Sequence, residues 1–236
     1  MRARESLDVQ IERLYQAFGV YGLSTLLDDA DSDEESAILQ TTPLRELPEP
    51  LLQVLPYQLL NTAGTLRDVK HLLPRILEAG ARGLCGMDPQ IGRMLRRAEW
   101  WSWPAGEVDE TRAFFRAYWD FLMESEEGGQ ADPVLSTLAN LEDDLQPYLE
   151  RWVEAKGRAS YLALARLALR AGPAIQQGHA RLDVMWEGRE RQWEQVAVWL
   201  AAPRTLEHLE KGYFATELPI VSDACEVLRV LSSPKP

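Results

Sequence analysis

The sequence predicts an all-α fold of about 8–10 helices in stacked antiparallel pairs, with no significant sheet. Apolar residues recur three and four positions apart along almost every segment, and no stretch alternates long enough to form a strand. Glycine and proline separate these segments, which is typical of short turns between neighbouring helices. The 236 residues are expected to form a single domain over 1–236.

Charge and composition narrow the classes of function. The chain carries 37 acidic and 25 basic residues, a net charge of −12 at pH 7, which opposes nucleic-acid binding and would attract a basic partner protein. Cys85 and Cys225 lie far apart without a metal-binding pattern, so we expect buried reduced thiols. An apolar leader and a membrane-spanning apolar stretch are both absent from the sequence, which predicts a cytoplasmic protein.

The N-terminal half contains four segments with helical periodicity. They are 5–18, 51–60, 65–79 and a helix that follows the Asp88-Pro89 pair. Pro56 and Pro74 lie inside two of these segments, and each predicts a kink or a break because proline lacks a backbone donor. Residues 28–50 are acidic at first and then rich in proline, so they are expected to form a loop.

The C-terminal half predicts six more helices. They cover 107–124, 133–152, 159–170, 179–200, 204–214 and 219–231. Pro147 would interrupt the second of these, and Gly172-Pro173 and Pro203 are expected to end the third and the fourth. The helix over 159–170 is apolar almost all round, which predicts a central position. Residues 232–236 are expected to form a frayed tail.

Residues 96–107, RRAEWWSWPAGE, place three tryptophans within four positions. Trp100 and Trp103 are three apart, so they would share a helix face from which Trp101 departs. Pro104 and the acidic residues after it predict a turn into the next helix. The main interpretation is a helix–turn–helix corner filled by indole rings, and the alternative is an exposed aromatic platform for a ligand.

The helix over 65–79 carries three polar residues on one face, at spacings of three and four: Asp68, His71 and Arg75. Arginines of the next helix would extend this face into a cationic groove that accepts a carboxylate or a phosphate. The candidate ligand-binding residues are His71, Arg75, Arg96, Arg97 and Trp101. The main interpretation of these polar residues is nevertheless a salt-bridge network between helices, in which Arg75 pairs with Asp68, Glu78 or Glu99.

The sequence predicts no catalytic residue, metal or cofactor. Asp68 and His71 have the spacing of one carboxylate–histidine ligand pair, but a di-metal bundle needs that pair twice. His179 and His208 have no carboxylate three residues before them. The motifs of zinc proteases, phosphate-binding loops, dinucleotide-binding folds and serine hydrolases are also absent.

Three passages resemble a family of bacterial cytoplasmic all-helical proteins with no established activity. They are GTLRDVKHLLPRILE (64–78), AEWWSWPAGEVDETRAFFRAYWDFL (98–122) and LEKGYFATELPIVSDACEVL (209–228). The matching residues are Gly64, Asp68, His71, Leu73, Pro74, Arg75 and Glu78, then Ala98, Trp100, Trp103, Pro104 and Glu107, then Phe214 and Thr216. Leu72 stands where the family has an aromatic residue. The resemblance implies a bacterial all-helical domain in which the Pro74 break belongs to the fold, and it implies no activity.

These observations favour a non-enzymatic protein–protein interaction module, either an immunity-type protein or a regulatory scaffold. The expected partner is another protein, and neither nucleic acid nor a membrane is expected. The alternative is a small-molecule or anion-binding protein, including an enzyme, with its site around His71, Arg75 and Trp100–Trp103. A homo-oligomer is compatible with either hypothesis, because periodicity does not separate a dimer face from a core face.

Overall fold

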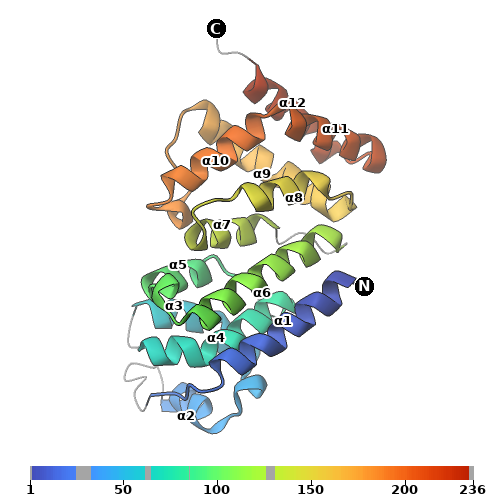
Figure 1. Cartoon of the computed structure of the whole chain (residues 1–236). Helices are drawn as coiled ribbons and strands as arrows, with labels where there is room; N and C mark the ends of the chain where they lie inside the picture. Colours follow the sequence, from blue (N-terminus) through green and yellow to red (C-terminus); the bar gives the residue numbers. More distant parts are fainter. Residues whose placement is uncertain (1, 25–32, 62–64, 85, 126–130, 234–236) are drawn as a thin grey trace. The chain divides into compact units, whose positions relative to one another are not determined.

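The computed structural model describes residues 2–24, 33–61, 65–84, 86–125 and 131–233, and every regular element within them is a helix (Figure 1). The α-helices are α1 (Arg2–Phe18), α2 (Asp33–Thr41), α3 (Glu49–Asn61), α4 (Leu66–Ala81), α5 (Gln90–Arg97), α6 (Ala105–Glu124), α7 (Ala131–Leu141), α8 (Gln146–Glu154), α9 (Arg158–Gln176), α10 (Glu190–Ala201), α11 (Pro203–Thr216) and α12 (Pro219–Ser232). Three short 3-10 helices lie between them: η1 (Leu44–Glu46), η2 (Trp100–Ser102) and η3 (Val184–Trp186). The all-α prediction is confirmed for these residues.

The described residues form twelve α-helices, more than expected, because one predicted loop contains a helix and one predicted helix is divided in two. The sequence predicts a loop over 28–50, but residues 33–41 form α2, a stretch that contains the strong helix formers Glu, Ala, Leu and Gln. The single helix expected over 133–152 is two helices, α7 and α8. Pro147 lies in the first turn of α8, where its missing N–H would have no intrahelical partner in any case.

Internal prolines do not end the helices that contain them. α3 continues through Pro56, α4 through Pro74 and α9 through Pro173. The predicted end of a helix at Gly172-Pro173 is therefore wrong, because the residues on either side of Pro173 are buried against the rest of the unit and packing outweighs the lost bond. The helix expected over 179–200 begins only at Glu190, and the stretch before it contains η3 and Gly188, which has a φ of 67°.

The first of two compact units, Met1–Tyr118, is organised around α4. α4 packs against α1 and α3, and α3 also packs against α5. Almost every residue of α4 from Asp68 onward is buried, so both its apolar and its polar side chains face the protein. The polar groups of α4 consequently need partners inside this unit.

The second compact unit, Trp119–Pro236, is organised around α9 and α12, which pack against each other. α9 also contacts α7, α10 and α11, which agrees with the central position predicted for it. A Cβ on Gly212 would lie closer than 3.0 Å to three ring atoms of Tyr161, so glycine is what lets α11 approach α9. Of the predicted tail, Ser232 belongs to α12 and 234–236 lie outside the described residues. The single-domain hypothesis concerns the two units together and stays a prediction.

Candidate functional site

The polar face of α4 holds the segment that follows α1. Asp68 accepts hydrogen bonds from the backbone N–H and the hydroxyl group of Ser24, at 2.7 and 2.6 Å. Nδ1 of the half-buried His71 lies 2.9 Å from the carbonyl oxygen of Tyr21. Two of the polar residues that the sequence brings to one face therefore contact the chain itself.

Asp68 also stabilises the start of α4. The Thr65 hydroxyl accepts a bond from the N–H of Asp68, and the Asp68 carboxylate accepts one from the N–H of Thr65, which completes a capping box. Burial would raise the pKa of Asp68, but the hydrogen bonds from Ser24 and Thr65 outweigh it and lower the pKa. The carboxylate is thus charged at neutral pH, buried and engaged in structural bonds.

Arg75 is engaged by a buried carboxylate one turn further along α4. Its Nη1 lies 3.3 Å from Oε2 of Glu78, and its Nη2 donates to the carbonyl oxygen of Leu47 at 3.1 Å. The same carboxylate accepts the hydroxyl of Tyr15 at 2.6 Å and Nε of Arg82 at 3.1 Å. Of the three carboxylates considered for Arg75, the structure pairs it with Glu78.

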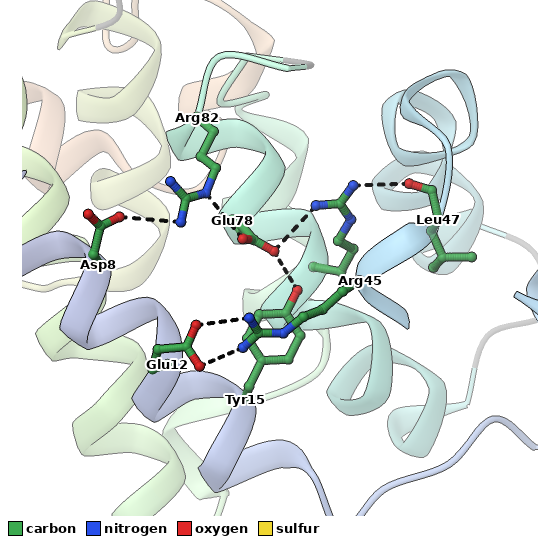
Figure 2. Close-up of polar contacts among 8 residues, drawn as sticks. Asp8, Glu12, Tyr15, Arg45, Leu47, Glu78 and Arg82 are labelled. Atoms are coloured by element: carbon green, nitrogen blue, oxygen red, sulfur yellow. Dashed lines mark hydrogen bonds and ion pairs between the residues drawn. The ribbon is translucent and has the colours of Figure 1, made fainter. Parts of the chain in front are cut away.

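An outer layer of ion pairs surrounds this carboxylate on α1 and η1. Arg45 makes two bonds with Glu12, at 2.9 and 2.7 Å, and its guanidinium lies 3.9 Å from the centroid of the Tyr15 ring. Arg82 reaches from Glu78 to Asp8, and Figure 2 shows it between the two carboxylates. We call this set the Glu78 network.

The charge state of the Glu78 network follows from its bonds. Burial would raise the pKa of Glu78, but the bonds from Tyr15 and Arg82 and the charge of Arg75 lower it. Burial and the adjacent carboxylate raise the pKa of Tyr15, so its hydroxyl remains a donor. Glu78 therefore occupies the place next to Arg75 that an external carboxylate would need.

The remaining candidate residues lie at the end of α5 and on η2. Arg96 is half-buried, whereas Arg97 and Trp101 are exposed. Within the described residues, no hydrogen bond, ion pair or ring contact joins His71 or Arg75 to Trp101. The described contacts thus do not bring the two halves of the predicted groove together.

The tryptophan segment forms a corner between α5 and α6. Glu99, at a φ of 48°, reverses the chain after α5. Trp100 and Trp103 are 1% and 6% exposed, and Nε1 of Trp103 donates to the carbonyl oxygen of Ala98 at 2.9 Å. Trp101, between them, is 56% exposed. The rings of Trp100 and Trp103 therefore fill the corner, and only the third ring is open to a ligand.

A buried ion pair that the sequence did not reveal joins α4 to α6. Nζ of Lys70 lies 2.7 Å from Oε2 of Glu107, and their side chains are 7% and 9% exposed. The Tyr21 hydroxyl donates to the other Glu107 oxygen and accepts a bond from Lys70. A signal existed, because Lys70 precedes Leu73 and Leu77 by three and seven positions and so lies on their buried stripe.

His208, on α11, is the buried histidine of the second unit. Its ring lies 4.9 Å from that of Tyr161, and its Nε2 has no hydrogen-bond partner among the described residues. Burial, together with the positive charges of Lys211 and Arg204, lowers the pKa of His208 from 6.5 to about 4. The neutral imidazole is therefore the form that the folded state favours.

This environment predicts a loss of stability in mild acid. The unfolded chain binds a proton at His208 below about pH 6.5, whereas the folded chain binds it only below about pH 4. Because the unfolded state binds the proton first, the free energy of unfolding falls as the pH drops through this window. We expect the His208 contribution to fall by about 2 kcal/mol between pH 7 and pH 5. Urea unfolding of His208→Phe should show a correspondingly smaller drop. The control His179→Gln, at an exposed position, should lose as much unfolding free energy between pH 7 and pH 5 as the unaltered chain. If His208→Phe also loses as much as the unaltered chain, the prediction is contradicted.

Cysteine and metal chemistry find little support in the described residues. Cys225 is a buried free thiol, as expected, and burial raises its pKa to about 11, so it is protonated at neutral pH. Cys85 lies outside the described residues. The part of the chain that the structure describes contains no group of three histidine, cysteine or carboxylate side chains placed to hold a metal ion.

Comparisons of the chain with protein-family models, curated proteins and solved structures found no match. The family resemblance of the three passages stays a prediction. Among the described residues, no helix is both long and apolar enough to cross a membrane.

Proposed function

We propose that the protein is a non-enzymatic protein–protein interaction module, an immunity-type or regulatory scaffold that works in the bacterial cytoplasm. The observation that carries the proposal is the exposure of large aromatic side chains on well-formed helical elements. Trp101 on η2 is 56% exposed, and Phe214 on α11 is 80% exposed. Aromatic side chains of this size dominate the binding energy of protein interfaces.

The polar residues that would serve a small ligand support the same proposal. Asp68, His71 and Arg75 hold the chain's own backbone and the Glu78 carboxylate. An anion that approached Arg75 would have to displace a buried carboxylate bound by Tyr15 and Arg82. The anion-binding alternative around His71 and Arg75 therefore has weaker support than an interaction surface elsewhere on the chain.

A capture experiment tests the proposal. The immobilised full chain is expected to retain one partner protein from a lysate of its own host, and the two should co-elute at a fixed stoichiometry in size-exclusion chromatography. The double variant Trp101→Ala/Phe214→Ala should weaken this complex by about tenfold or more, because it removes these two exposed rings. The matched control Val9→Ala/Val198→Ala, at two exposed aliphatic positions, should retain it. Failure to recover any stoichiometric partner would overturn the proposal.

A further inference from the structure

The two tryptophans that flank Trp101 in this segment, Trp100 and Trp103, are buried and hold its backbone in place. The bond from Trp103 Nε1 to Ala98 closes the corner, and the Trp103 ring packs edge-on against Phe18 at a centroid distance of 5.8 Å. On the other side, Trp100 is 1% exposed. With both neighbours anchored, Trp101 loses little backbone freedom on binding, which lowers the entropic cost of a contact.

The α5 side of this corner is locally basic, although the chain is acidic. Residues 90–106 contain three arginines, Arg93, Arg96 and Arg97, and a single carboxylate, Glu99. Beyond the turn, the start of α6 carries Glu107, Asp109 and Glu110 as well as Arg112, whose guanidinium lies 5.2 Å from the centroid of the Trp100 ring, so the positive excess is confined to α5. Because salt screens charges over roughly 8–10 Å, an incoming segment responds to these groups more than to distant carboxylates.

The stability of α5 does not explain these arginines. Arg93 and Arg97 are one helical turn apart, and like charges at that spacing destabilise a helix by a few tenths of a kcal/mol. Neither residue forms an ion pair in the described part of the chain. Within the described residues, their charges are therefore available to a group on another molecule.

We propose that the corner, made of Trp101 with Arg93 and Arg97, binds an acidic segment of a partner protein. An apolar side chain of that segment would pack on the Trp101 indole, and its carboxylates would pair with the two guanidinium groups. This inference rests on the proposed interaction function and reverses, at this corner, the basic partner expected from net charge. A short acidic segment fits better than a nucleic-acid strand, because a strand extends beyond the corner and meets the surrounding negative field.

A peptide selection tests the inference directly. Random peptides displayed on phage are selected against the immobilised full chain, and the affinity of the best synthetic peptide is measured by fluorescence anisotropy. Enriched sequences should combine glutamate or aspartate with one aromatic or aliphatic residue. Trp101→Ala and Arg97→Glu should each weaken binding by about tenfold or more. The matched control Arg166→Glu, an exposed arginine of the second unit, changes net charge equally and should weaken it less than about twofold.

Each other result would overturn the inference. Enrichment of neutral or basic peptides, no enrichment, or affinity unchanged in Trp101→Ala would show that the corner is not an acidic-segment site. Tighter binding of a labelled oligothymidine that is lost in the same two variants would reassign the corner to single-stranded nucleic acid. If the host partner is captured but binds Trp101→Ala as well as the unaltered chain, this inference fails while the interaction function stands. Absence of any partner in the capture experiment defeats the proposed function itself.

Discussion

Replacing Lys70 by methionine is expected to lower the free energy of unfolding by about 3–5 kcal/mol. The change leaves the Glu107 carboxylate buried at 9% exposure without its cation, so a desolvated charge loses its compensation. Urea unfolding followed by tryptophan fluorescence measures the effect, because Trp103, whose ring centroid lies 4.8 Å from Nζ of Lys70, is buried in the folded chain and becomes exposed on unfolding.

A second substitution separates the charge effect from packing. In Lys70→Met/Glu107→Gln the buried charge is gone, and the amide oxygen still accepts the Tyr21 hydroxyl. We expect this double variant to regain at least about half of the lost stability. A Lys70→Met cost below about 1 kcal/mol, or a double variant no more stable than the single one, would show that the pair is not desolvated as described.

Replacing Gly212 by alanine is expected to destabilise the second unit by about 2–3 kcal/mol. The new methyl group would meet the Tyr161 ring closer than 3.0 Å, and that ring also packs against His208. The ring has little room to move, so α11 would have to shift away from α9. Thermal and urea unfolding monitored by circular dichroism would report the loss.

The matched control is Gly106→Ala in the first turn of α6. Apart from its chain neighbours and the backbone of its own helix, no atom lies within 4 Å of the Cβ that it would introduce, so alanine is expected to leave stability unchanged or raise it by up to about 1 kcal/mol. Tyr161→Leu in the Gly212→Ala background should recover part of the loss. If Gly212→Ala and Gly106→Ala behave alike, the close approach of α11 to α9 is not what requires glycine.

Local patterns predicted local structure well in this chain. The segments 5–18, 65–79, 204–214 and 219–231 correspond to α1, α4, α11 and α12, with ends that differ by a few residues. Helical periodicity depends on neighbours three and four positions apart, so it can be recognised without knowledge of the fold. The same reasoning failed at Pro173, where burial of the surrounding residues carries α9 past a residue that disfavours it.

The candidate site shows the limit of the same patterns. Spacing correctly placed Asp68, His71 and Arg75 together on α4, but it did not reveal what they meet. Besides Thr65 and Glu78, which lie three positions away, their partners are Ser24, the Tyr21 carbonyl and the Leu47 carbonyl, which come from 28 to 50 positions away. The role of a polar residue depends on such distant groups, and the spacing of residues in sequence does not predict which of them it will contact.

The sequence by itself determined the helical class, most helix positions and the division of the tryptophan segment into two rings on one face and one departing from it. Tertiary structure alone decided that Arg75 is occupied by Glu78, that Lys70 and Glu107 are buried together, and that Trp101 remains exposed. The physical reason is range. Helix formation follows from backbone bonds four residues apart, whereas burial and charge pairing depend on helices that meet only after the chain has folded.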